Sequence, residues 1–232
     1  MKKIIALLLI VATACCVLVG CGKVDPNKKS EGVMTYEEYD KAALDAEVTV
    51  EGFVQATQSW WSDKITVYLQ DGEGAYFIYE LACSEADAAK LTQGTKIKVK
   101  GYKAEWAGEV EIVDATFEFV DTEDTWVAGA TDVTALLGTD DLIKHQNKFV
   151  VFNDMTVKAI EYKGGTPGDD IYVTLTKGDA DYSFCVERYL TGPDTDVYKA
   201  VGELKAGDVI DVEGFLYWYD GPNPHVTKIT VK

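Results

Sequence analysis

The chain repeats part of its own sequence, and this repeat limits its fold more than any other feature. Six positions recur 113 residues further along the chain. They are Leu91, Gly94, Ile97, Val99, Gly101 and Tyr102 in the first copy, and Leu204, Gly207, Ile210, Val212, Gly214 and Phe215 in the second. With one inserted residue, the match continues from Ile112, Ala115 and Phe117 to Val226, Ile229 and Val231. The chain is therefore predicted to contain one small domain twice.

Each copy is predicted to contain five strands and one helix, because its apolar residues alternate in short runs bounded by turn residues. In the first copy the strands are expected near 48–54, 65–70, 75–81, 96–100 and 109–120, and the helix at 84–91. In the second they are expected near 149–160, 171–176, 182–186, 209–218 and 226–231, and the helix at 195–204. Two further helices are expected in the linking segment, at 132–137 and 140–145. A helix between strands three and four is typical of the OB-fold, a five-stranded Greek-key barrel. We therefore predict a mainly β protein with two tandem OB-fold barrels.

The N-terminus has the pattern of a lipoprotein signal. Lys2 and Lys3 precede an apolar run that closes with Leu18, Val19, Gly20 and Cys21, the order that a lipoprotein signal peptidase reads. The alternative is a membrane-spanning helix, but a run of 16 residues is shorter than the roughly 20 needed to cross a bilayer. We expect residues 1–20 to be a signal peptide and Cys21 to carry a lipid that anchors the chain to the cell membrane on its extracytoplasmic face.

The sequence also predicts how the mature chain is divided into a tether and two domains. Residues 21–32 are mostly polar and are predicted to be the lipidated cysteine and a flexible tether. Residues 33–123 are assigned to the first OB-fold domain, and residues 124–232 to the second with its helical linker. Beyond Cys21 the mature chain keeps only Cys83 and Cys185, which do not form a disulfide framework. Both are expected to be buried thiols.

Aromatic residues mark a candidate site. OB-fold ligands lie across strands two and three, between the loop joining strands one and two and the loop joining strands four and five. In the first domain these loops carry Trp60, Trp61 and Trp106, and Tyr68 and Tyr76 are expected to form the floor. Such a platform could stack a sugar ring. The corresponding loop of the second domain carries Tyr217, Trp218 and Tyr219.

Structural roles for these aromatic residues stay open. Of two adjacent tryptophans in a strand pattern one should face inward, so Trp60 or Trp61 is expected to close the end of the barrel. Alternation places Trp218 on the face opposite Tyr217 and Tyr219. The two aromatic rims could also face each other as a domain interface.

Charge argues against nucleic acid as a partner. The formal charge is −17, and loss of the two lysines in residues 1–20 makes it −19. Such a surface repels phosphate backbones at long range. The alternative function is single-stranded nucleic-acid binding through Lys96, Lys98 and Lys100, the main local basic feature. Solvated strand residues are the simpler reading of this stripe.

Enzyme motifs are not found. The chain has two histidines, His145 and His225, and neither belongs to a Ser or Cys catalytic motif. No catalytic residue, metal site or cofactor is predicted. The expected function is that of a non-catalytic binding or adaptor module for an oligosaccharide or a protein.

The segments Ser59–Ser62 and Gly214–Tyr219 resemble those of a group of uncharacterised tandem OB-fold lipoproteins from anaerobic gut bacteria. The resemblance covers nearly the whole mature chain. It implies the tandem barrel fold and the surface location, but no ligand or activity, since a fold alone does not choose a function.

Overall fold

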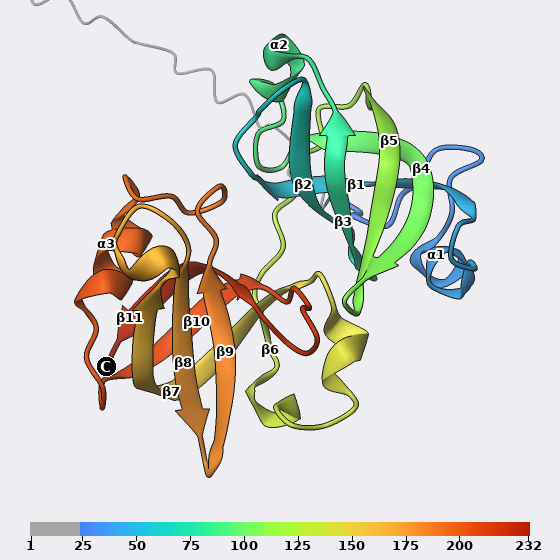
Figure 1. Cartoon of the computed structure of the whole chain (residues 1–232). Helices are drawn as coiled ribbons and strands as arrows, with labels where there is room; N and C mark the ends of the chain where they lie inside the picture. Colours follow the sequence, from blue (N-terminus) through green and yellow to red (C-terminus); the bar gives the residue numbers. More distant parts are fainter. Residues whose placement is uncertain (1–23) are drawn as a thin grey trace, which may run out of the picture.

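The computed structural model describes residues 24–232, which form two β-barrels (Figure 1). The predicted signal peptide and Cys21 lie outside the described residues. The first barrel closes in the order β1-β2-β3-β5-β4. Its strands are β1 (Glu47–Thr57), β2 (Lys64–Gln70), β3 (Ala75–Ala82), β4 (Lys96–Trp106) and β5 (Glu109–Phe119). Helix α1 (Tyr36–Lys41) precedes β1, and α2 (Glu85–Ala88) lies between β3 and β4. Strand β3 runs parallel to β5, and the other pairs are antiparallel.

The second barrel repeats this arrangement. Its strands are β7 (Phe149–Tyr162), β8 (Ile171–Lys177), β9 (Ala180–Val186), β10 (Val209–Phe215) and β11 (His225–Val231), with α3 (Asp196–Glu203) between β9 and β10. The sheet order is β10-β11-β9-β8-β7, and pairing of β10 with β7 closes the ring. Strand β11 runs parallel to β9, as β5 does to β3. The short β6 (Thr131–Asp132) adds to β7. The predicted mainly β fold of two OB-fold-like units is confirmed.

The glycines repeated before the fourth strand form the same turn in both barrels. Gly94 and Gly207 have φ angles of 87° and 98°, in the left-handed region that glycine tolerates best. The Gly94 N–H donates to the Val54 carbonyl of β1, and the Gly207 N–H donates to the Val157 carbonyl of β7, each at 2.8 Å. The turn before the fourth strand is therefore tied to the first strand in the same way twice.

Gly101 and Gly214 are required by a close approach of two backbones. A Cβ atom at Gly101 would lie 2.7 Å from the carbonyl oxygen of Val113, and one at Gly214 would lie 2.1 Å from that of His225. No real Cβ atom makes such contacts, so a larger residue would force the fourth and fifth strands apart. These glycines are therefore repeated in the sequence because both barrels bring the same two backbones close together.

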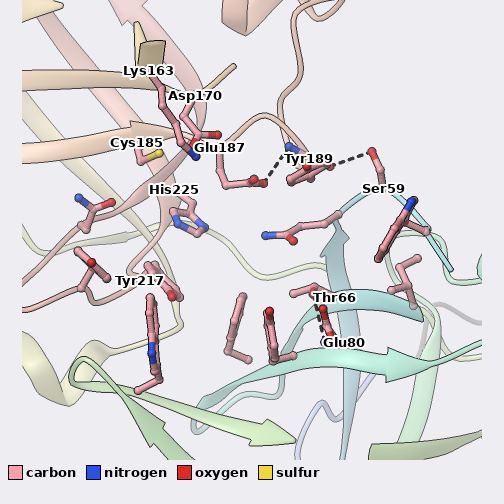
Figure 2. Close-up of a pocket in the computed structure, with 18 of the residues that line it drawn as sticks. Ser59, Thr66, Glu80, Lys163, Asp170, Cys185, Glu187, Tyr189, Tyr217 and His225 are labelled. Carbon is pink, nitrogen blue, oxygen red and sulfur yellow. Dashed lines mark hydrogen bonds and ion pairs between the residues drawn. The ribbon is translucent and has the colours of Figure 1, made fainter. Parts of the chain in front are cut away.

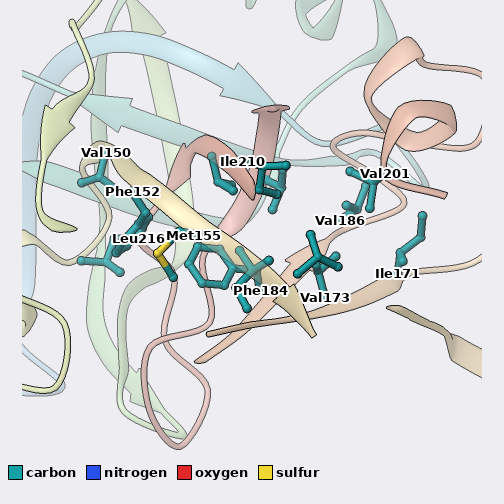
Figure 3. Close-up of a cluster of buried hydrophobic side chains, with 14 of the residues drawn as sticks. Val150, Phe152, Met155, Ile171, Val173, Phe184, Val186, Val201, Ile210 and Leu216 are labelled. Atoms are coloured by element: carbon teal, nitrogen blue, oxygen red, sulfur yellow. The ribbon is translucent and has the colours of Figure 1, made fainter. Parts of the chain in front are cut away.

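Each barrel has its own hydrophobic core. The second core is drawn in Figure 3, where Phe152 and Phe184 meet edge to face with ring centroids 5.0 Å apart. The first core contains Val67, Leu69 and Ile78 from β2 and β3. Two separate cores are what two domains of about 100 residues each need to be stable.

Two local predictions differ from the structure. The strand predicted at 209–218 ends at Phe215, because the N–H of Tyr217 donates to the Phe215 carbonyl at 2.8 Å and turns the chain. In place of the two predicted helices, the linking segment forms the strand β6 and two short 3-10 helices, η1 (Thr134–Leu136) and η2 (Leu142–His145), with Gly138 at a φ of 75° between the helices. A third 3-10 turn, η3 (Lys163–Gly165), follows β7.

The segment predicted to be a flexible tether contacts the first barrel. Lys29 Nζ lies 2.5 Å from the buried Asp71 carboxylate and also donates to the Glu51 carbonyl. Lys96 Nζ donates to the Lys28 carbonyl at 2.6 Å. Composition alone missed these contacts because a single lysine reaching a buried carboxylate leaves no periodic pattern. In residues 24–232 no helix is both long and apolar enough to cross a membrane.

Candidate functional site

A cleft of about 870 Å³ lies between the two barrels (Figure 2). The first barrel lines it with the β1–β2 loop, β2, β3 and the β4–β5 turn. The second barrel lines it with β8, β9, the segment after β9, and the β10–β11 loop. In the OB-fold these are the surfaces on which ligands usually lie. The two barrels therefore present to each other the faces on which other OB-folds bind their ligands.

Exposed aromatic side chains gather in this cleft. They are Trp61, Tyr79 and Trp106 from the first barrel, and Tyr172, Tyr189 and Tyr219 from the second. Trp61 is 74% exposed and Trp106 is 55% exposed. The rings of Trp106 and Tyr219 meet across the two barrels with centroids 5.2 Å apart. Large apolar surfaces left open to water in one concave region are typical of a recognition site.

Both exposed tryptophans lie next to tight turns. Trp61 pairs with Lys64 across a two-residue turn in which Ser62 and Asp63 have φ angles of 51° and 59°. Trp106 precedes Ala107 and Gly108, whose φ angles are 51° and 86°. Positive φ at both central residues defines the type I′ turn, which fits the twist of a hairpin. The backbone of each tryptophan thus lies at a tight hairpin end.

A hydrogen-bonded group forms the floor of the cleft. Gln58 donates to the Tyr68 hydroxyl at 3.2 Å, and that hydroxyl is hydrogen-bonded to His225 Nδ1 at 2.6 Å. Burial lowers the pKa of His225 to about 3, so the imidazole in this bond is neutral. Tyr217 stacks on the imidazole with centroids 4.2 Å apart. The floor therefore joins β2 of one barrel to β11 of the other.

Behind this floor the two barrels are in direct contact along a surface that we call the seam, formed by Tyr68, Phe77, Phe149 and Phe215. Tyr68 stacks on Phe215 with ring centroids 4.3 Å apart and an interplanar angle of 23°. Gln70 Oε1 accepts the Phe149 N–H at 2.9 Å. The seam is closed, whereas the cleft is open.

Glu109 is buried beside the seam. Its Oε2 accepts the Trp218 N–H at 2.8 Å and a weaker bond from Gln146 at 3.3 Å. Burial raises the pKa of Glu109 well above its ordinary value, more than these hydrogen bonds lower it. The Glu109 carboxyl group therefore links the two barrels by hydrogen bonds, and its burial disfavours its ionised form.

The charged side chains of the cleft are mostly paired. Lys64 lies 2.6 Å from Glu80, and Lys163 lies 2.9 Å from Asp170. Glu187 follows β9, and its Oε2 accepts the N–H groups of the next turn, from Tyr189 at 3.0 Å and Leu190 at 2.8 Å. Burial raises the pKa of Glu187 to about 7 despite these two bonds.

The structure brings some of the predicted site residues together. Trp61, Trp106, Tyr217 and Tyr219 line the cleft. Tyr68 lies directly beneath it as part of the seam. Cys21 lies outside the described residues.

Besides Tyr68, three predicted residues do not line the cleft. Trp60 packs on the first core and donates its indole N–H to the Cys83 carbonyl at 2.8 Å. Trp218 packs against the second core, with its Cδ1 close to Gly108. Tyr76 is fully buried in the first barrel, because its hydroxyl donates to Asp71 at 2.8 Å. The expected floor position of Tyr76 is taken by Phe77, on the opposite side of the strand.

Sequence reasoning missed the contribution of Tyr79, Tyr172, Tyr189 and Glu187. Tyr79 shares the outer face of β3 with Phe77, so the correct alternation would have found it. Tyr189 follows the end of β9 in an irregular segment, where no period applies.

The lysine stripe lies elsewhere and is paired. Lys96 lies 2.8 Å from Glu51, Lys100 lies 3.0 Å from Glu47, and Lys98 pairs with Glu118. Lys103 donates to three carbonyl oxygens at the end of α1. None of these lysines is among the residues that line the cleft. The prediction that they form a nucleic-acid surface therefore gains no support from their positions.

Comparisons with known proteins give structural matches only. No family model matches the chain, and no curated protein matches it. The chain is similar to a murine DNA-binding protein bound to double-stranded DNA, with 10% identity, coverage of 80% of this chain and 96% of that one, and a TM-score of 0.39. It is also similar to the Ifi202 HINa domain bound to 20-bp double-stranded DNA (10% identity, 81% and 98% coverage, TM-score 0.36). A third match is a Replication Protein A heterotrimer bound to single-stranded DNA (11% identity, 83% and 51% coverage, TM-score 0.34).

The sequence argument against nucleic acid as a partner is contradicted by these matches, because proteins of similar architecture were solved in complex with DNA. Net charge was a poor guide because it averages over the whole surface, whereas an OB-fold ligand meets one face of a barrel. At these TM-scores the similarity does not identify the ligand of this chain. The choice of ligand must come from the cleft itself.

Proposed function

We propose that the protein is a non-catalytic binding protein whose ligand, an oligosaccharide, lies in the cleft between the barrels. The observation that carries the proposal is the set of exposed aromatic rings on both walls of this cleft, with Trp61 and Trp106 at tight hairpin ends. Sugar rings stack on such faces through their C–H groups. Uncharged polar side chains in the same lining, including Gln58, Ser183 and Asn223, are available to bond hydroxyl groups.

The size of the cleft supports a ligand of several rings. Its volume of about 870 Å³ falls in the upper part of the range of roughly 300 to 1,000 Å³ that is usual for small-molecule sites. The aromatic side chains come from both barrels, so a chain-like ligand would contact both at once. Neither barrel alone would form this site.

We also propose that Cys21 carries a lipid and holds the protein on the extracytoplasmic face of the cell membrane, as in the tandem OB-fold lipoproteins that it resembles. The support is the charged and apolar pattern that ends at Cys21. Labelling cells with a radioactive fatty acid tests this. Label should enter the wild type and be absent from a Cys21→Ser variant, and label retained in that variant would contradict the proposal.

Single-stranded nucleic acid is a second candidate, favoured by the same aromatic faces. Bases stack on exposed Trp and Tyr side chains with little sequence preference, each stack contributing about 1–3 kcal/mol. Here the site would be the cleft rather than the lysine stripe. Backbone contacts to phosphate would make the affinity fall steeply with salt, which separates this candidate from a neutral glycan.

A binding screen decides between the candidates. Residues 22–232 would be tested against glycans, single-stranded DNA and peptides, with a Trp61→Ala/Trp106→Ala variant alongside. Tyr102→Ala is the matched control, because Tyr102 is 45% exposed but does not line the cleft. We expect glycan binding that is lost in the double variant and kept in the control. Glycan binding that the double variant retains, or no glycan binding at all, would overturn the proposal. A DNA hit that weakens with salt would establish the second candidate.

A further inference from the structure

Glu187 stands apart from the other carboxylates in the cleft. Glu80 and Asp170 each have a lysine partner within 3 Å. Among the residues that the structure describes, no Lys, Arg or His side chain forms an ion pair with Glu187. The cleft lining therefore contains two paired cations and three carboxyl groups, which leaves one carboxyl group without a cationic partner.

One oxygen of Glu187 is available to a ligand. Oε2 accepts both N–H groups of the following turn, which fixes the position of the carboxyl group. Within the described part of the chain, Oε1 receives no hydrogen bond. Figure 2 shows the side chain reaching from the second barrel into the centre of the cleft, between Asp170 and Tyr189.

The surroundings of Glu187 favour a cation rather than an anion. Asp170 lies close enough to raise its pKa further, while Lys163, which is itself paired with Asp170, lowers it only weakly. Tyr68 from β2 and Cys185 from β9 are also near the group. Burial raises the pKa of each of them, and the Glu187 charge raises it further. Burial of an uncompensated carboxylate is costly, and a bound cation removes that cost.

Aromatic rings add to this preference. The faces of Trp and Tyr attract a desolvated ammonium group through their quadrupoles. Tyr172, Tyr189 and Tyr217 line the same cleft as Glu187. The strongly acidic chain, with a net charge of −17, also concentrates cations near its surface.

We propose that the ligand carries a protonated amine that binds Glu187 Oε1, so that the protein selects oligosaccharides of amino sugars whose amines are not acetylated. This inference rests on the proposed function. The sugar rings stack on the aromatic walls, while the amine supplies the charge that the cleft lacks. An N-acetyl group would replace that charge with a neutral amide and leave Glu187 unpaired.

Two glucosamine hexamers of the same linkage test the inference by calorimetry at pH 7, one fully deacetylated and one fully N-acetylated. We expect the deacetylated hexamer to bind at least tenfold more tightly, in line with a charge-assisted hydrogen bond. Glu187→Gln should bring the two affinities to within about twofold. Glu203→Gln is the matched control, because it removes one negative charge from an exposed position on α3 outside the cleft.

Each outcome decides the question. Equal affinities in the wild type, a preference that survives in Glu187→Gln, or binding of neither hexamer would overturn the inference. If the N-acetylated hexamer binds equally well and the Trp61/Trp106 variant abolishes its binding, the inference fails and the proposed function stands. The wild-type comparison does not depend on whether the Glu187→Gln variant folds.

Discussion

The seam and the cleft both lie between the two barrels, but aromatic side chains are buried in the seam and exposed in the cleft. In the seam, Tyr68 and Phe215 are buried and stacked on each other. In the cleft a few residues away, Trp61 and Trp106 remain mostly exposed. Residue type is therefore a poor guide to role in this protein. What separates the two groups is whether the ring is buried by its neighbours or left open to the cleft.

The largest expected effect is on the seam. Phe215→Ala should lower the free energy of unfolding by about 3–5 kcal/mol, because it leaves a cavity under Tyr68 and between the barrels. Denaturant unfolding measures this. The matched control is Phe119→Ala, since Phe119 is 38% exposed at the end of β5 and should cost less than about 1 kcal/mol. Equal losses in the two variants would mean that the seam does not stabilise the protein.

A smaller effect is expected from the hydrogen bond that crosses between the barrels. Tyr68→Phe keeps the stacked ring but leaves His225 Nδ1 buried without its hydrogen-bond partner, which should cost about 1–3 kcal/mol. Comparing its thermal unfolding with that of Tyr182→Phe controls for loss of a hydroxyl, because the Tyr182 side chain is only half-buried. A Tyr68→Phe variant as stable as the wild type would show that the seam depends on stacking alone.

A substitution in the cleft should affect ligand binding rather than stability. Trp61→Ala should change the free energy of unfolding by less than about 0.5 kcal/mol, because the ring is exposed. The same variant should weaken ligand binding by roughly tenfold through loss of one stacking face. Measuring both quantities on one preparation tests the comparison directly. Marked destabilisation together with unchanged binding would place Trp61 with the structural residues.

A final effect concerns pH. Because burial raises the pKa of Glu187 to about 7 in the folded protein, above the ordinary value of 4.5, the folded state binds more protons than the unfolded state between these two values. The contribution of Glu187 to stability should therefore fall as pH rises from about 4.5 to about 7 and level off above that. The difference in melting temperature between Glu187→Gln and wild type should grow in favour of the variant over this interval, and a constant difference would contradict the assigned pKa.

Much of the fold could be predicted from the sequence because it has a local signature. The repeated glycines and the alternation of apolar residues placed most strands within a few residues of their observed ends. The strand predicted to reach 218 was too long, because nothing in the alternation reveals the turn that a Tyr217 backbone bond creates. The docking of Lys29 on Asp71 was missed for a related reason, since it joins positions 42 residues apart.

The candidate site was only partly predictable. Trp61 and Trp106 were found because loop position in an OB-fold carries information. Tyr76 was misplaced because its inward orientation depends on the buried Asp71, a tertiary contact. That the two rims share one cleft depends on how the barrels pack. No local pattern encodes the seam, so the contribution of Tyr189 and Glu187 could not be foreseen.

The fixed contact between the barrels has a consequence for the rate of binding. The seam holds one side of the cleft, and the Ser59 N–H donates across the barrels to the Tyr189 carbonyl at 2.8 Å on the other. With both sides tied, the walls cannot swing apart on a hinge between domains. Little conformational entropy is then lost when a ligand enters. Association should follow a single encounter step at a rate set by diffusion and orientation, and differences between ligands should appear in how long they stay bound.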